Sequence, residues 1–184
     1  MATESPADEL GVAAPAFALP ATDGRMYTLD DVRGRDGLVV VFMCNHCPYV
    51  KAILPHLLRD ARELAALGVG TVAINSNDAA TYPEDSFERM VALSTELQLP
   101  FPYLYDETQD VARAYGAVCT PEFYGFDATL HLRYRGRLDA SRKGPIPDAP
   151  RELFDAMKQI ASTGSGPEVQ NPAFGCSIKW KMTA

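Results

Sequence analysis

The chain has 184 residues, of which 47% are hydrophobic and 22% are charged, and its formal net charge is −7. This length and composition predict a single globular domain, spanning residues 1–184, that can bury a substantial core. The acidic charge excludes nucleic acid and anionic membranes as expected partners. No apolar run is as long as a membrane span, and the acidic residues 1–14 do not resemble a signal peptide. We therefore expect a cytoplasmic protein, where structural disulfides are rare.

The predicted elements alternate between strands and helices. Residues 1–14 are expected to form a mobile arm, and residues 163–184 a C-terminal tail whose first part, 163–172, lacks regular structure. Strands are predicted at 15–19, 38–43, 69–74 and 101–105, with a hairpin at 123–134. Helices are predicted at 29–32, 49–67, 83–97, 106–115 and 151–161. The order predicts an α/β fold with a mixed central sheet and helices on both faces.

A Cys-x-x-Cys motif, formed by Cys44 and Cys47, lies where the predicted strand 38–43 meets the following helix. The first N–H groups of a helix have no internal partner, and the helix dipole places partial positive charge there. A thiolate at this point is stabilised, so its pKa falls and it becomes a nucleophile near neutral pH. The second thiol can close a reversible disulfide with it. The motif in this context predicts a redox centre.

Three other interpretations of the motif fit less well. A zinc site needs four ligands, and the remaining candidates show no second paired spacing: Cys119, Cys176, His56 and His131. Haem attachment needs a histidine directly after the second cysteine, where this chain has proline. Two buried structural cysteines are the remaining alternative, because free cysteine packs well in a core. We therefore expect neither a metal nor another cofactor.

Several longer segments resemble peroxiredoxin-like members of the thioredoxin family, within the alkyl hydroperoxide reductase and thiol-specific antioxidant superfamily. The matching segments are CNHCPYVK at 44–51, AINSND at 73–78, YPEDSF at 82–87, DETQ at 106–109, CTP at 119–121, YRGR at 134–137 and GCSIKW at 175–180. They are spread over nearly the whole chain. The resemblance implies a thioredoxin-like fold with a peroxiredoxin-type N-terminal extension and a central insertion between Asn75 and Asp106.

Two functional patterns within this resemblance assign the cysteines differently. The thioredoxin pattern makes Cys44 the attacking thiolate and Cys47 the resolving thiol, and it implies a cis Pro121 facing them. Its buried acid is replaced by Leu38. The peroxiredoxin pattern Pro-x-x-x-Thr-x-x-Cys makes Cys47 peroxide-reactive, but Val40 and Cys44 stand where its proline and threonine would be. Because donors that would orient a peroxide are missing, we expect disulfide exchange to exceed peroxide reduction.

His46, between the two cysteines, is the first candidate for a supporting role. Its imidazolium is expected to favour the anionic form of Cys44, which we expect to have the lower thiol pKa. One argument favours Cys47 instead. Proline is favoured at the first position of a helix, so a helix that starts at Pro48 would put Cys47 at the helix cap.

Five further residues are candidates beyond the motif itself. Thr120 and Pro121 are expected to lie over the cysteine pair and to dock the backbone of a partner. Cys119 is either a third redox thiol or a small buried apolar residue. Glu122 is expected to be a surface carboxylate rather than a proton acceptor. Cys176 is expected to be an inert thiol in a docked tail.

The sequence therefore predicts a thiol–disulfide oxidoreductase whose partners are protein or small-molecule disulfides and thiols. A thiol peroxidase that uses the same cysteines is the first alternative, with a peroxide as its substrate. A metal- or copper-handling module is the second alternative. The oligomeric state is left open, with a homodimer as one option.

Overall fold

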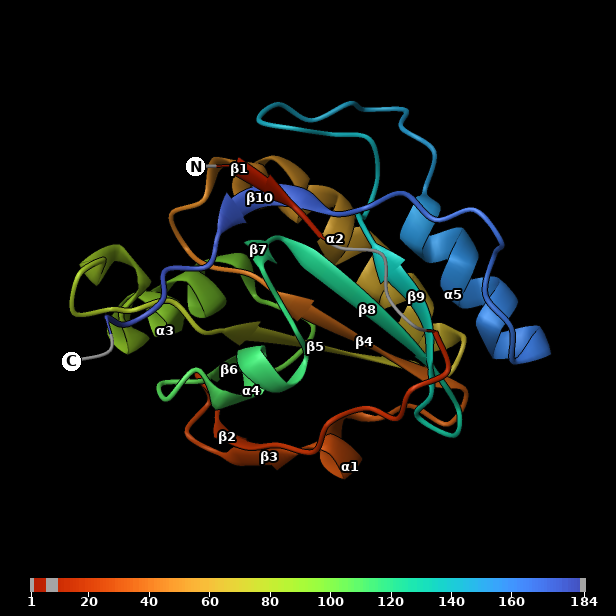
Figure 1. Ribbon diagram of the computed structural model, residues 1–184, viewed down its shortest axis with the longest axis horizontal. Coiled ribbons are helices and arrows are strands. Elements are labelled where there is room, and N and C mark those ends of the chain that lie inside the picture. The colour runs from red at the N-terminus through yellow and green to blue at the C-terminus, as the bar shows by residue number, and fades with distance from the viewer. Residues whose placement is uncertain (1, 6–9, 183–184) are drawn as a thin grey trace.

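A computed structural model describes residues 2–5 and 10–182 (Figure 1). Its centre is a five-stranded sheet in the order β6-β5-β4-β8-β9. The strands are Gly37–Phe42 (β4), Val69–Asn75 (β5), Tyr103–Tyr105 (β6), Glu122–Asp127 (β8) and Leu132–Gly136 (β9). β4, β5 and β6 are parallel, whereas β8 pairs antiparallel with both β4 and β9. The predicted mixed sheet is therefore confirmed.

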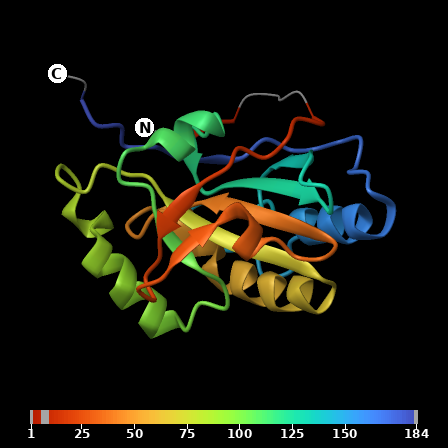
Figure 2. The same cartoon turned by 90° about the horizontal axis from the view of Figure 1, so that it is seen from below.

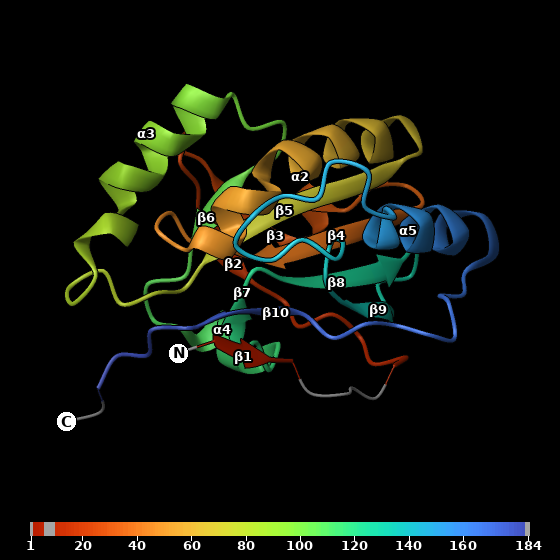
Figure 3. The same ribbon diagram turned by 90° about the horizontal axis from the view of Figure 1, so that it is seen from above.

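Helices cover both faces of this sheet. They are Leu29–Val32 (α1), Pro48–Ala66 (α2), Phe87–Leu97 (α3), Asp110–Ala114 (α4) and Glu152–Thr163 (α5). Figure 3 shows α2 and α5 on one side of the sheet, with α3 beside β6. The hairpin of β2 (Ala18–Pro20) and β3 (Met26–Thr28) covers the opposite side (Figure 2). None of the helices in the described part of the chain has both the length and the apolar character needed to cross a bilayer.

β4 leads directly into the cysteine motif, which follows the carboxyl end of this central strand. Val39 and Val41 pack into the core that contains α2 and α5, whereas Val40 and Phe42 pack into the core on the hairpin side. All six residues of β4 are buried, as expected for a strand covered on both faces. The strand ends at Phe42 and α2 begins six residues later, at Pro48. The cysteines therefore lie at the carboxyl end of a central strand, where α/β sheets place their sites.

The two ends of the chain differ from the prediction. Ala2–Glu4 form β1 and Phe174–Ser177 form β10, which pairs with both β1 and β7 (Cys119–Thr120). The expected arm and tail therefore contribute to a second, three-stranded sheet (Figure 1). Residues 1 and 6–9 of the arm and 183–184 of the tail lie outside the described residues. Strands this short carry too little periodicity to be recognised in sequence.

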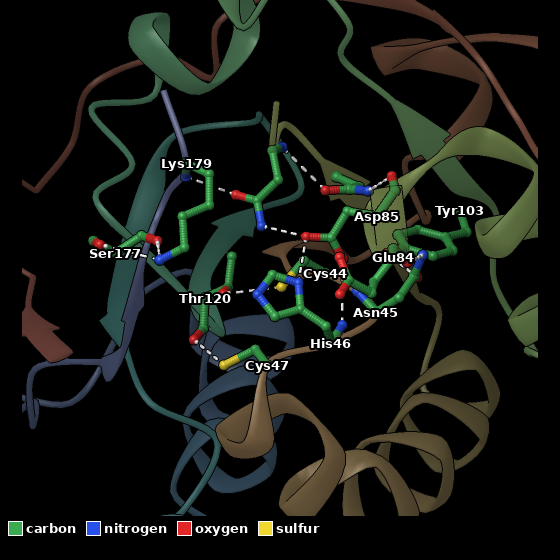
Figure 4. Close-up of polar contacts among 12 residues, drawn as sticks. Cys44, Asn45, His46, Cys47, Glu84, Asp85, Tyr103, Thr120, Ser177 and Lys179 are labelled. Atoms are coloured by element: carbon green, nitrogen blue, oxygen red, sulfur yellow. Dashed lines mark hydrogen bonds and ion pairs between the residues drawn. The ribbon is translucent and has the colours of Figure 1, made fainter. Parts of the chain in front are cut away.

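The predicted helix at 83–97 is interrupted at Ser86. Pro83–Asp85 form a short 3-10 turn (η1), and α3 begins only at Phe87. Ser86 has an extended backbone and caps α3 by accepting a hydrogen bond from the N–H of Arg89. The turn leaves the side chain of Asp85 facing the cysteine motif (Figure 4). Sequence reasoning missed the break because Pro-Glu-Asp is itself a good helix start.

Candidate functional site

Cys44 and Cys47 lie at the junction of β4 and α2, as the sequence predicts. Cys47 is the N-cap residue of α2, and Pro48 occupies the first helical position. The exposed fraction of each cysteine is 0%. The Sγ atom of Cys44 lies 3.4 Å from Oγ1 of Thr120, and Sγ of Cys47 lies 3.2 Å from the carbonyl oxygen of Thr120 (Figure 4). Both sulfurs therefore contact the same residue of β7.

The peptide bond between Thr120 and Pro121 is cis. Thr120 is buried, and its hydroxyl and carbonyl face one sulfur each. The predicted cis bond and its position over the cysteine pair are therefore both confirmed.

The two thiols ionise very differently. The interaction with Cys44 has the largest effect on the pKa of Cys47. Together with interactions from Cys176 and the Val50 backbone, it lowers that pKa to about 5, although burial opposes the shift. The same interaction, burial and the charge of Asp85 raise the pKa of Cys44 well above its ordinary value. These interactions therefore favour the anion at Cys47 over the anion at Cys44.

The prediction that Cys44 has the lower pKa is wrong. Pro48 starts the helix one residue after Cys47, so Cys47 is the residue that receives the N–H of Val50. Cys44 lies before the helix and near the carboxylate of Asp85, whose charge disfavours a second anion. The argument from Pro48, which favoured Cys47, agrees with the structure.

Removing the thiol of Cys44 is expected to raise the pKa of Cys47. Cys44→Ala deletes the strongest stabilising donor, so the pKa should rise from about 5 towards the ordinary cysteine value of about 8.5. Cys44→Ser keeps a hydroxyl donor and should shift the pKa less. The ultraviolet absorbance of the thiolate, followed against pH, measures both shifts. An equal pKa in Cys44→Ala and the unmodified protein would contradict the assignment.

Asp85 organises the loop between the two cysteines. Its Oδ1 accepts hydrogen bonds from the backbone N–H groups of Asn45 and His46, at 2.8 and 3.3 Å. Its Oδ2 accepts one from Nδ2 of Asn77 at 2.7 Å and lies 2.6 Å from Nδ1 of His46. The carboxylate is fully buried, and these contacts replace the water that it has lost. Asp85 therefore holds both the backbone and the imidazole of the motif.

His46 is oriented by Asp85 on one side and by an aromatic ring on the other. Its imidazole stacks on Tyr82, with ring centroids 5.9 Å apart and an interplanar angle of 2°. A carboxylate only accepts, so Nδ1 of His46 donates and Nε2 is left to exchange a proton with other groups. The sequence placed His46 beside the cysteines but assigned no role to Asp85, whose contacts span 40 residues of chain. The signal for Asp85 was its place in the matching segment YPEDSF at 82–87.

One group of side chains in the described residues has the geometry to bind a metal ion. Ligand atoms of Cys44, His46 and Asp85 lie within 4.8 Å of one another. A structural zinc site would need a fourth ligand, and Cys47 does not belong to the group. The hydrogen bond between His46 and Asp85 accounts for their closeness without a metal. The geometry therefore favours a redox motif over the metal-handling alternative.

Glu122 and Cys119 are both buried behind Thr120. Glu122 has an exposed fraction of 0%, accepts hydrogen bonds from the N–H groups of Val118 and Cys119, and lies 2.6 Å from the guanidinium of Arg135. The prediction that Glu122 is a surface carboxylate is therefore wrong. β8 is an inner strand, and Arg135 compensates the buried charge of Glu122. Burial and the charge of Glu122 raise the pKa of Cys119. Cys119 therefore fits the role of a small buried apolar residue better than that of a third redox thiol.

Cys176 lies in a docked segment, as expected. That segment is a strand, and it brings Cys176 close to the cysteine motif. β10 pairs with β7 so that Cys176 lies opposite Thr120. The side chain and the backbone of Cys176 contribute to lowering the pKa of Cys47. The prediction missed this influence because it placed no strand beside the motif in the C-terminal tail.

Comparisons with known proteins agree with this fold. The crystal structure of an uncharacterized conserved protein from Geobacillus kaustophilus has a TM-score of 0.94 and 49% identity, covering 100% of this chain and 98% of the other. That of a hypothetical protein from Sinorhizobium meliloti 1021 has a TM-score of 0.93 and 38% identity, covering 98% and 100%. The thiol-disulfide oxidoreductase ResA of Geobacillus thermodenitrificans is 30% identical over 132 residues, which are 68% of this chain and 67% of that protein.

The match to a protein family covers the whole candidate site except β10. Residues 10–138 match the AhpC/TSA family model, and this range includes both cysteines of the motif, Asp85 and the segment around Pro121. More distant solved structures, such as the thioredoxin domain of a thiol-disulfide oxidoreductase from Bacteroides vulgatus, share the fold at a TM-score of 0.65. The chain belongs to the AhpC/TSA family of oxidoreductases and has a thioredoxin-like fold.

Proposed function

We propose that this protein is a thiol–disulfide oxidoreductase in which Cys47 is the attacking thiolate and Cys44 is the resolving thiol. The observation that carries the proposal is the pKa of Cys47, lowered to about 5 at the cap of α2, beside a protonated Cys44. A thiolate present at neutral pH, with a second thiol in contact, is what exchange requires. The proposal reverses the roles that the thioredoxin pattern gives to the two residues.

The proposed reaction has two exchange steps. The sulfur of Cys47 attacks a substrate disulfide, forms a mixed disulfide and releases one substrate thiolate. Cys44 then loses its proton and attacks the sulfur of Cys47. The second substrate thiolate leaves and takes up a proton, so the substrate is reduced and the Cys44–Cys47 pair is oxidised.

His46 is proposed to take the proton that Cys44 must lose. The pKa of Cys44 is raised, so its attack needs a base. Nδ1 of His46 is held by Asp85, which leaves Nε2 as the basic nitrogen of the neutral ring. One ligand atom each from Cys44, His46 and Asp85 lie within 4.8 Å of one another, so the imidazole lies beside the thiol of Cys44.

Access to Cys47 limits which partners can react. Both cysteines are fully buried. A protein disulfide must therefore displace part of the cover over Cys47. The cover includes β7, through the carbonyl of Thr120, and β10, which pairs with β7. Protein or small-molecule disulfides remain the proposed substrates, in a cytoplasm where thiol reductants return the pair to its reduced state.

A thiol peroxidase is the second candidate, and the ionisation of Cys47 favours it. Cys47 occupies the peroxide-reactive position of the peroxiredoxin pattern and carries the lowered pKa. Its thiolate would attack a peroxide oxygen and release an alcohol or water. Cys44 would then attack the resulting sulfenic acid, which gives the same disulfide and one water. Against this candidate, Cys44 stands where the threonine donor would be.

Rates measured with two oxidants separate these candidates. Reduced protein is mixed with oxidised glutathione or with hydrogen peroxide, and loss of free thiol is followed in time. We expect exchange to be faster than peroxide reduction. Loss of one donor that stabilises developing charge slows a reaction by about 10²-fold or more, and this site lacks such a donor for a peroxide. Faster reaction with peroxide, lost in Cys47→Ser, would establish the peroxidase instead.

A further inference from the structure

Two cations from the loop between β9 and α5 lie beside the start of α2. The guanidinium carbon of Arg142 is 3.9 Å from the centroid of the Phe174 ring. Nζ of Lys143 is 5.7 Å from the centroid of the Tyr49 ring. Tyr49 is two residues from Cys47, and its ring packs edge-on against Phe174 with centroids 5.5 Å apart. Figures 1 and 3 show this loop lying over α2. Both cations are therefore held next to the helix end that carries Cys47.

The loop that carries these cations is anchored to α2. Oδ2 of Asp139 lies 2.6 Å from Nδ1 of His56, and the exposed fractions of the two side chains are 3% and 13%. Oδ1 of Asp139 accepts a hydrogen bond from the N–H of Ser141 at 2.7 Å. The hydroxyl of Ser141 in turn accepts one from the N–H of Ile146 at 2.9 Å. The loop is thus held in one shape before any substrate arrives, which lowers the entropy that binding costs.

The charge of these cations is not offset within the described part of the chain. Arg142 and Lys143 are exposed, and no carboxylate of residues 2–5 and 10–182 forms an ion pair with either of them. Lys179 adds a third positive charge just beyond β10, where its Nζ donates to the carbonyl and hydroxyl oxygens of Ser177, which are neutral. Figure 4 shows both of these residues beside Thr120. We call Arg142, Lys143 and Lys179 the cationic rim.

The cationic rim opposes the charge of the rest of the molecule. The chain has a net charge of −7, and the thiolate of Cys47 and the carboxylate of Asp85 add negative charge at the motif itself. An anionic substrate would be repelled from such a site. A cluster of cations reverses the local potential, and it can raise the association rate of an anion by about 10-fold or more. Guanidinium groups also bind carboxylates through paired hydrogen bonds.

We propose that the preferred substrate is a small-molecule disulfide that carries a carboxylate close to each sulfur, and that the cationic rim selects it. The proposal rests on the proposed function and leaves its exchange steps unchanged. Cys47 is fully buried, so a small disulfide has to displace less of the cover than a protein disulfide does. Asp139 and His56 are positioning residues, because they act through the loop that holds Arg142 and Lys143.

Three disulfides of equal chain length test the selection by charge. Dithiodipropionate carries two negative charges, hydroxyethyl disulfide carries none and cystamine carries two positive charges. The rate of thiol loss from reduced protein is measured with each, and the rates with the charged disulfides are divided by the rate with the neutral one. This division cancels any change in the ionisation of Cys47. In Arg142→Gln/Lys143→Gln the ratio for dithiodipropionate should fall by about tenfold, and the ratio for cystamine should rise.

A matched control removes the same charge elsewhere. Arg62 and Lys158 are exposed on α2 and α5, and Arg62 lies about 20 Å along the helix axis from Pro48. Arg62→Gln/Lys158→Gln should leave the ratios as in the wild type. Lys179→Gln should lower the ratio for dithiodipropionate by about threefold, as expected for one charge. Asp139→Ala should lower it although both loop cations remain, whereas lost stability alone would slow all three reactions alike.

Salt and the remaining outcomes complete the test. The fall in Arg142→Gln/Lys143→Gln should shrink in about 0.5 M salt, where exposed charges are screened within a few ångströms. An unchanged ratio in this variant, or an equal fall in Arg62→Gln/Lys158→Gln, would overturn the role of the cationic rim. If the reduced wild-type protein reacts with none of the three disulfides but consumes hydrogen peroxide, the proposed function fails instead.

Discussion

Replacement of Cys47 by serine should abolish thiol–disulfide exchange and peroxide consumption alike. We expect the rate to fall by about 10⁶-fold, the scale observed when a catalytic nucleophile is removed. A serine hydroxyl stays protonated at neutral pH, whereas the pKa of Cys47 is about 5. Cys44 cannot take over, because burial and Asp85 keep it in the thiol form. The measurement is consumption of oxidised glutathione and of hydrogen peroxide by each reduced protein.

The control for this loss separates attack from resolution. Cys44→Ser keeps the attacking thiolate and a hydroxyl donor beside it, so it should complete one attack and stop as the mixed disulfide. Cys119→Ala should retain full turnover, because Cys119 is buried apart from the reacting sulfurs and contacts Glu122. Activity that survives in Cys47→Ser but is lost in Cys44→Ser would restore the roles of the thioredoxin pattern.

Local sequence patterns predicted the parts of the site that depend on neighbours along the chain. An apolar strand followed by Cys-x-x-Cys and a helical pattern placed the thiols at a helix start, which the structure confirms for Cys47. The resemblance to the thioredoxin pattern implied the cis bond before Pro121, which the structure also has. These features follow from backbone geometry within a few residues, so the sequence alone contains them.

The parts that the sequence did not predict depend on contacts between distant segments. Asp85 reaches the motif only because η1 ends at Ser86 and the chain turns there. Cys176 lies opposite Thr120 only because a four-residue strand pairs with β7. The error over the thiolate had a different cause. Pro48 indicates that Cys47 is the cap residue, whereas the thioredoxin pattern and the imidazole of His46 both favoured Cys44.

Replacement of Asp85 by alanine should destabilise the protein and change the chemistry of the buried thiol. The backbone N–H groups of Asn45 and His46 and the amide of Asn77 would lose their acceptor. Buried donors left without a partner cost about 1–3 kcal/mol each, so we expect the free energy of unfolding to fall by about 3–5 kcal/mol. Denaturant unfolding of the reduced protein measures this loss.

The charge of Asp85 has a separate effect that its neutral isostere reveals. Asp85→Asn keeps an oxygen acceptor but removes the negative charge that raises the pKa of Cys44, so that pKa should fall. The pH at which the Cys44–Cys47 disulfide closes fastest should therefore move downward. Asp106→Asn is the matched control: Asp106 is an equally buried carboxylate that accepts from Ser76 and the N–H of Ala112. Asp106→Asn should lower the free energy of unfolding without moving this pH dependence. A shift of the same size in both variants would show that altered packing, rather than the charge of Asp85, controls the pKa of the Cys44 thiol.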